Sequence, residues 1–201
     1  MTLARLTAAV IAALAALGVA WQFQIDGTIA EPLPWLARAW NMLRFYTIIT
    51  NLLVVVVLAR AALGLRVGPN LAATVTLSII MVGVVYRLLL APAEPKPAPD
   101  YYPDFLMHVA TPLLVPLWWA AFADRDLRLK GLLAWLTLPA AYLVYALVRG
   151  FLTGRYPYFF LDLGKSGPGL VLGYSLGLIA AFALAGLALY LVSRLLPRRQ
   201  P

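Results

Sequence analysis

Long apolar stretches alternate with short polar segments along the whole chain. A helix needs roughly 20 consecutive apolar residues to cross a bilayer, and each stretch approaches that length. The stretches lie at residues 4–23, 43–63, 70–91, 105–123, 131–151 and 168–194. This pattern predicts an all-α polytopic membrane protein, in which a bundle of six transmembrane helices forms a single domain over residues 1–201.

The composition supports this prediction and narrows the chemistry. The chain is 63% hydrophobic and only 12% charged, whereas soluble domains have about 25% charged residues. It has no cysteine and one histidine, His108, which excludes disulfides, thiolate nucleophiles, bis-histidine haem and paired-histidine zinc sites. We therefore expect neither a cofactor nor a metal. The first stretch continues to Phe23, which is long for a signal peptide, so we expect a retained first helix.

Basic residues between the stretches predict the orientation of the helices. One side holds Arg5, Arg60, Arg66, Arg125, Arg128, Lys130, Arg194, Arg198 and Arg199, and the other holds Arg38, Arg44, Arg87, Lys96, Arg149, Arg155 and Lys165. Several cations of the second group lie in or beside helices, so the free loop cations favour the first side as cytoplasmic. We expect both termini to face the cytoplasm. The net charge of +8 then reflects topology and contact with membrane lipids, with no nucleic-acid partner.

The loops on the opposite, outer side are the longer ones. Residues 24–42 carry Trp35 and Trp40 and are expected to form an interfacial segment. Residues 92–103 hold five prolines, which predicts an extended, irregular segment. Residues 152–167 are rich in aromatic side chains and predict a further loop.

Unusual polar side chains gather near the outer ends of several predicted helices. They are Arg44, Thr47, Thr50 and Asn51 in the second helix, Tyr86 and Arg87 in the third, His108 and Thr111 in the fourth, Tyr142, Tyr145 and Arg149 in the fifth, and Asp162 before the sixth. Positions 44, 47 and 51 share one helical face, and Pro112 is expected to bend the fourth helix beside the imidazole. Polar groups inside a membrane usually face the bundle interior, which favours a common site. Each also has a simpler interpretation, because threonines bond their own helix carbonyls and arginines reach lipid headgroups.

One apparent catalytic motif is rejected. Residues 173–177 read GYSLG and match the GxSxG pattern of a nucleophile elbow. That elbow requires a strand, a sharp turn and a helix, whereas this match lies within a continuous apolar stretch. We interpret its glycines and serine as small residues at a helix-packing surface.

Three segments, RFYTIITN, MHVATPLLVP and YPYFFLDLGKSGPG, occur in this order along the chain. In their order and spacing they resemble the androgen-induced integral membrane protein family. Vertebrate members of that family are multipass hydrolases that cleave fatty acid esters of hydroxy fatty acids, using a threonine and a histidine. The resemblance implies that Thr47 matches the threonine and His108 the histidine.

This sequence departs from the family pattern in its fourth helix. The vertebrate segment carries more than one histidine and differs slightly in its spacing to the proline, so Thr111 is an alternative match for the corresponding position. His108 is nevertheless the only imidazole in this chain. The Ala-, Leu- and Arg-rich composition is typical of a bacterial relative, which places the chain in the inner (plasma) membrane and leaves its substrate open.

The hypothesis that follows is an intramembrane threonine hydrolase of lipid esters. Thr47 would attack the ester carbonyl with His108 as base, because an unassisted threonine hydroxyl is a poor nucleophile. Asn51, Tyr145 or Arg44 would stabilise the oxyanion, and Asp162 would orient the imidazole if its loop folds inward.

Two other functions use the same observations. A non-catalytic lipid-binding or membrane-assembly protein would use the same outer-leaflet cavity without turnover. A transporter or channel is disfavoured, because no predicted helix carries a run of acidic groups and the two halves of the chain do not resemble each other. In the hydrolase and the lipid-binding protein alike, the lipid partner would arrive laterally from the bilayer.

Overall fold

The computed structural model describes residues 1–26, 34–92 and 100–196, and this part of the chain is helical without any strand. The helices are α1 (Leu3–Asp26), α2 (Trp35–Met42), α3 (Tyr46–Ala62), α4 (Pro69–Val85), α5 (Tyr101–Phe105), α6 (Thr111–Phe122), α7 (Leu132–Thr153) and α8 (Leu163–Leu195). Short helical turns lie at Tyr86–Leu90 (η1), Leu106–Ala110 (η2), Leu129–Gly131 (η3) and Phe159–Leu161 (η4).

The prediction of a polytopic membrane bundle is confirmed. Five helical segments in the described ranges are long and apolar enough to cross a bilayer: Leu3–Asp26, Pro69–Leu90, Tyr101–Phe122, Leu129–Thr153 and Leu163–Leu195. A sixth span is formed by α2 and α3 if the two are taken together across a bend of 98°. Many large apolar side chains of these helices are exposed on the outside of the bundle, as lipid contact requires. The chain is therefore an integral membrane protein.

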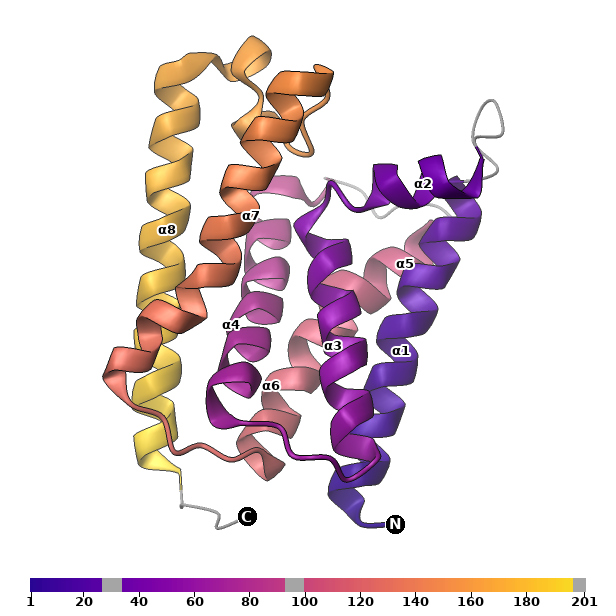
Figure 1. The fold of residues 1–201 in the computed structure, drawn as a ribbon, viewed down its shortest axis with the longest axis vertical. Helices are drawn as coiled ribbons and strands as arrows, with labels where there is room; N and C mark the ends of the chain where they lie inside the picture. The colour runs from indigo at the N-terminus through magenta and orange to yellow at the C-terminus, as the bar shows by residue number, and fades with distance from the viewer. Residues whose placement is uncertain (27–33, 93–99, 197–201) are drawn as a thin grey trace.

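The bend between α2 and α3 corrects the predicted second span. We expected a helix over 43–63, but α3 begins at Tyr46. Arg44 thus lies in the turn before α3 and does not share a helical face with Thr47 and Asn51. In Figure 1, α2 lies across one end of the bundle, nearly perpendicular to α1 and α3, as an interfacial segment would.

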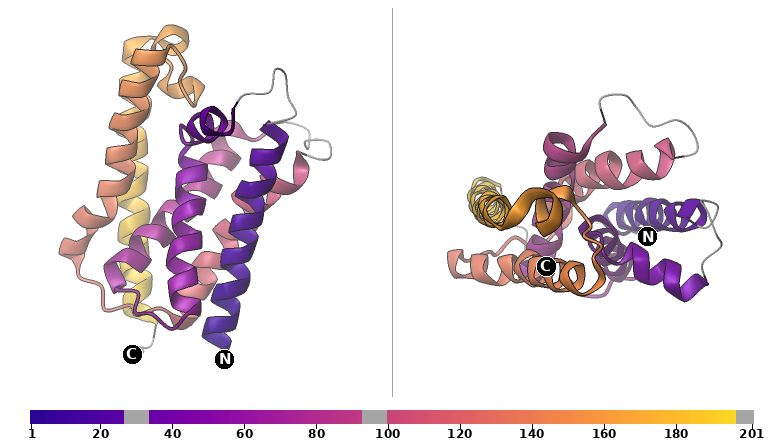
Figure 2. Two further views of the ribbon diagram at one scale, coloured as in Figure 1. Left: turned by 45° about the vertical axis from the view of Figure 1, so that its right-hand side comes forward. Right: turned by 90° about the horizontal axis from the view of Figure 1, so that it is seen from above.

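The helices form two groups joined by α4. It packs against α3 and α6 on one side and against α7 and α8 on the other, while α1 packs mainly on α3. Figure 2 shows α7 and α8 on one side of the bundle and α1 and α2 on the other. The start of α1 and the end of α8 lie at the same end of the bundle (Figure 1). That this end faces the cytoplasm stays a prediction.

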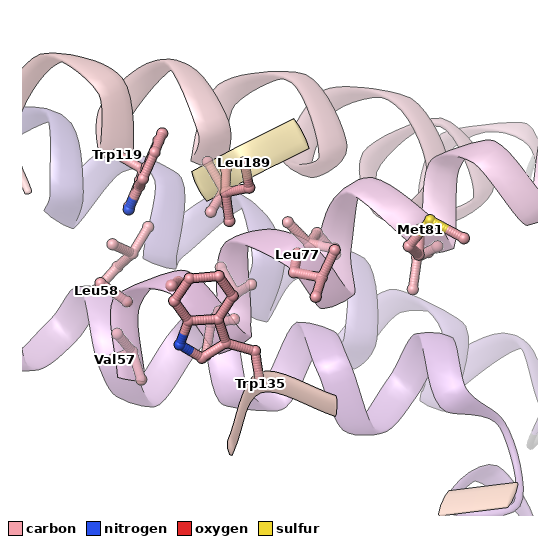
Figure 3. Close-up of a cluster of buried hydrophobic side chains, with 14 of the residues drawn as sticks. Val57, Leu58, Leu77, Met81, Trp119, Trp135 and Leu189 are labelled. Carbon is pink, nitrogen blue, oxygen red and sulfur yellow. The ribbon is translucent and has the colours of Figure 1, made fainter. Parts of the chain in front are cut away.

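A buried hydrophobic cluster fastens α4 to its neighbours. Leu77 is fully buried and Met81 nearly so, and both belong to one buried cluster with Leu58 of α3, Trp119 of α6, Trp135 of α7 and Leu189 of α8 (Figure 3). Trp119 and Trp135 are the largest side chains that are almost completely buried. Because lipid is as apolar as these side chains, close packing and hydrogen bonds hold the helices together.

The fourth span is irregular next to its histidine. Residues Leu106–Ala110 form a π-helical turn between α5 and α6, and Pro112 occupies the first turn of α6. The proline has no N–H to bond the carbonyl of His108, so the predicted disturbance of this helix takes the form of a π-turn. Gly83 of α4 packs closely here, since a Cβ at Gly83 would lie 2.8 Å from Pro112 Cβ.

Two predicted loops are partly helical. Of the segment 92–103, residues 93–99 lie outside the described part, and a helix already begins at Tyr101. It contains Pro103, which is tolerated in a first helical turn because that turn needs no N–H donor. Likewise, in the loop predicted at 152–167, α7 continues to Thr153 and a short helical segment starts at Leu163, but the backbone leaves helical geometry at Gly167 (φ 74°), so the long final helix starts at Pro168, as predicted.

The GxSxG match lies inside α8, as expected. Ser175 is buried and its hydroxyl donates to the carbonyl of Val171 at 2.7 Å, in the same helix. A serine bonded in this way within a helix is not presented as a nucleophile.

Candidate functional site: a threonine–histidine pair between two cavities

Thr47 is the second residue of α3 and lies at the bend that follows α2. Its side chain is only slightly exposed, at 9%, and lines two cavities. The first turn of a helix carries N–H groups without partners inside the helix and the positive end of the helix dipole. The hydroxyl is therefore placed where negative charge is favoured.

His108 reaches Thr47 from the π-helical turn of the fourth span. Its Nε2 lies 3.3 Å from Thr47 Oγ1, although the two residues are 61 positions apart in sequence. This distance is slightly longer than the 2.6–3.2 Å of a tight catalytic hydrogen bond, as is common without substrate. The predicted pairing of the only imidazole with this threonine is thus present in the structure.

Asp104 orients the imidazole from one helical turn earlier. His108 Nδ1 lies 3.1 Å from the Asp104 backbone oxygen and 3.4 Å from the carboxylate Oδ1. A backbone carbonyl can only accept a hydrogen bond, so in the neutral ring Nδ1 must carry the proton. Nε2 is then left unprotonated and accepts from the Thr47 hydroxyl, the tautomer that a general base needs.

Tyr86 contacts both His108 and Asp104. Its ring stacks on the imidazole of His108, with centroids 3.9 Å apart and planes inclined by 14°. Its hydroxyl donates to Asp104 Oδ2 at 2.5 Å. Tyr86 therefore restrains the ring rotation of His108 and bonds the other carboxylate oxygen of Asp104.

A second set of hydrogen bonds connects α3 to α6 next to the Thr47–His108 pair. Thr111 donates to Asn51 Oδ1 at 2.9 Å, and Asn51 Nδ2 donates to the backbone oxygen of Thr47 at 2.9 Å. Asn51 and Thr111 are fully buried. They position Thr47 and His108 relative to each other, and neither lines a cavity described below.

Tyr158 approaches the site from the segment between α7 and α8. Its hydroxyl accepts a hydrogen bond from the backbone N–H of Tyr46 at 3.0 Å. Burial raises the pKa of the Tyr158 phenol above its usual range, and hydrogen bonds with Thr47 and Tyr142 offset this only in part. The phenol is therefore a neutral donor beside Thr47.

Other residues expected at the site lie elsewhere. Asp162 does not orient His108: its carboxylate accepts from the N–H groups of Gly164 and Lys165 and caps α8. Capping satisfies N–H groups that the start of α8 would otherwise leave unpaired, which draws the side chain into its own helix. Thr50 is fully buried and lines neither cavity, so it is not placed as a nucleophile.

Tyr145 and Arg149 fasten α7 to the corner between α2 and α3. The Tyr145 hydroxyl donates to the backbone oxygen of Leu43 at 3.0 Å, and Arg149 donates to the Tyr145 hydroxyl. Tyr145 is thus not aimed at Thr47 as an oxyanion donor. Arg44, by contrast, lines the same cavity as Thr47 and His108.

Two cavities meet at Thr47. The apolar cavity has an empty volume of about 800 Å³ and lies between α4, α7 and α8, with Leu143, Leu178 and Phe182 in its wall. The polar cavity, of about 1350 Å³, lies under α2 and contains His108 and Asp104. The two share Thr47, Tyr86, Leu90 and Tyr158 as common lining.

No protein-family model, no curated protein and no solved structure matches this chain. The geometry of its own residues therefore carries the functional argument. Among the described residues, no group of three or more acidic or histidine side chains is arranged to hold a metal ion.

Sequence reasoning missed the roles of three contributors to the site. Asp104 had a usable signal, because it precedes His108 by four residues and such pairs are neighbours on a helix. Tyr86 was expected among the polar groups at the outer helix ends, but no sequence signal linked it to His108 or linked Tyr158 to Thr47, because these contacts arise from tertiary packing.

Proposed function

We propose that this protein is an intramembrane hydrolase of lipid esters, with Thr47 as nucleophile and His108 as general base. The observation that carries the proposal is the 3.3 Å approach of Thr47 Oγ1 to His108 Nε2 at the junction of two cavities. The resemblance to the androgen-induced integral membrane protein family, whose members hydrolyse fatty acid esters, supports the same pair of residues.

The hydrogen bonds of the pair suggest how the first step proceeds. As Thr47 Oγ1 attacks the ester carbonyl carbon, its proton passes to His108 Nε2. The imidazolium that forms keeps its Nδ1–H toward Asp104, whose carboxylate lies 3.4 Å away and offsets the new charge. The tetrahedral intermediate collapses when His108 returns the proton to the departing alcohol oxygen, leaving an acyl-threonine.

Water completes the cycle by the same route. His108 takes a proton from a water molecule, whose oxygen attacks the acyl carbon and releases Thr47. The proton then returns to Thr47 Oγ1 and the fatty acid departs. The polar cavity beside His108 is the source of this water, because it is lined by several charged groups.

The oxyanion of each intermediate needs donors at the same place. Tyr158, a neutral phenol next to Thr47, and the positive end of the α3 helix dipole are proposed for this role. They replace two of the donors expected from the sequence, Asn51 and Tyr145, whose hydrogen bonds are directed to backbone oxygens of Thr47 and Leu43.

The two cavities suggest how a substrate is oriented. The acyl chain of the ester would occupy the apolar cavity between α4, α7 and α8, which accepts lipid from the bilayer. The alcohol portion would occupy the polar cavity under α2. The carbonyl then lies at the shared boundary, next to Thr47.

Labelling of purified protein with a fluorophosphonate tests the proposal. The wild type should carry the label on Thr47, located by peptide mass spectrometry, and should hydrolyse a long-chain ester in detergent micelles. Thr47→Ala should lose both properties, and Thr47→Ser should keep part of each because a hydroxyl remains. Thr50→Ala, which removes a buried neighbouring hydroxyl, is the matched control and should keep both.

The same experiment separates the alternative function. A lipid-binding or assembly protein would bind the ester in this cavity, with no turnover and no label on Thr47. Unchanged hydrolysis by Thr47→Ala would exclude this residue as nucleophile.

A further inference from the structure

Three arginines line a separate cavity where α2 meets the end of α7. Arg44, Arg149 and Arg155 surround an empty volume of about 630 Å³. The other described lining residues are Trp40, Asn41 and Thr153, so none of the described lining is acidic. Like charges that share one cavity repel each other more strongly than they would in water.

Arg149 is fixed in this cavity. It is only 8% exposed, and its Nη2 donates to the backbone oxygen of Trp40 at 2.6 Å. The guanidinium also lies over the Trp40 ring, 4.0 Å from its centroid. Because both contacts hold the side chain in place, its charge cannot swing out into water to escape its neighbours.

The other two guanidiniums have donors to spare. Arg44 donates from Nε to the backbone oxygen of Asn41 at 3.0 Å, which leaves both of its Nη groups for another partner. Arg155 is exposed, and its backbone N–H donates to the Thr153 hydroxyl at 3.4 Å. Within the described part of the chain, neither Arg44 nor Arg155 forms an ion pair. The nearby carboxylate of Asp26 lines the adjoining cavity and accepts a hydrogen bond from Gln22.

The level of the cavity in the membrane indicates its ligand. It lies beside α2, which turns by 98° from α3 and exposes Trp35 and Trp40. Tryptophans of this kind lie at the headgroup level of a bilayer. Lipid phosphates are the most abundant anions at that level, and arginine binds phosphate through pairs of parallel hydrogen bonds.

We infer that this cavity binds the phosphate of an anionic phospholipid headgroup, through Arg44, Arg149 and Arg155 together. The bound phosphate would neutralise the three cations and would tie α2 to α7. This inference does not depend on ester hydrolysis, and its test uses no ester.

Native mass spectrometry of the full chain in a non-ionic detergent tests the inference. Phosphatidylglycerol is titrated into delipidated protein, and the wild type should retain one molecule at concentrations where phosphatidylcholine is not retained. Arg155→Gln should weaken retention severalfold, and the double variant Arg44→Gln/Arg155→Gln should weaken it at least tenfold. Arg128→Gln, the same charge change in the loop before α7, should leave retention unchanged.

Competition with inorganic phosphate and the comparison of the Arg155 and Arg128 variants distinguish this inference from its alternatives. Inorganic phosphate at millimolar concentration should compete only weakly, and complete displacement by it would show that the ligand is a free phosphate rather than a lipid. Equal losses in the Arg155 and Arg128 variants would overturn the inference, since each arginine would then meet lipid separately. Arg155 is exposed, so its single variant remains informative even if the double variant fails to fold.

Discussion

Asp104→Asn tests the catalytic arrangement most sharply, because it removes one charge and almost no volume. If His108 is the base, the imidazolium in the transition state faces the Asp104 carboxylate, with Nδ1 3.4 Å from Oδ1. Two unit charges at this distance attract by about 5 kcal/mol at an effective dielectric constant of about 20. Because both charges are spread over two atoms and the site is partly open to water, about 3–4 kcal/mol is a realistic loss.

This loss corresponds to a decrease of about 10²–10³-fold in kcat, since each 1.36 kcal/mol is about tenfold in rate. A triad aspartate changed to asparagine elsewhere costs about 10⁴-fold, partly because the wrong tautomer forms. Here the backbone oxygen of Asp104, 3.1 Å from Nδ1, still selects the correct tautomer in the variant. The expected effect is therefore smaller than in such a triad.

Steady-state ester hydrolysis in detergent micelles measures the effect. KM should change less than kcat, because the imidazolium that the carboxylate stabilises forms only during the reaction. Asp100→Asn is the matched control, since it removes a carboxylate one turn earlier in the chain and should leave kcat unchanged. A wild-type kcat in Asp104→Asn would refute the assigned role, and an equal loss in Asp100→Asn would show that the effect is a general change of charge.

Three further outcomes are expected. His108→Gln should be inactive throughout a pH–rate series, because no other imidazole in the chain can act as the base. Leu178→Trp should fill part of the apolar cavity and shift the preference toward shorter acyl chains in a chain-length series, whereas Leu172→Trp, on an exposed surface, should not. Gly83→Ala should lower the free energy of unfolding by about 1–3 kcal/mol, measured as a lower melting temperature, because its Cβ would overlap the proline ring of α6. Gly173→Ala, with open space around it, should leave the melting temperature unchanged.

The sequence by itself determined the class of fold and the approximate position of every span. Apolar stretches near the thickness of a bilayer leave few alternatives, because backbone groups in lipid must be paired within helices. The sequence also indicated His108 as the candidate base, because it is the only imidazole in the chain. Such conclusions follow from length and composition, which need no knowledge of which helices touch.

Tertiary structure alone decided which polar groups act on one another. The sequence offered Asp162 to orient His108, but the start of α8 takes its carboxylate as a cap, and Asp104 fills the place instead. The bend before Tyr46 removed Arg44 from the helical face on which periodicity had placed it. Tyr158 reaches the site from more than a hundred residues away, and a contact between helices depends on their rotation and crossing, which no single helix specifies.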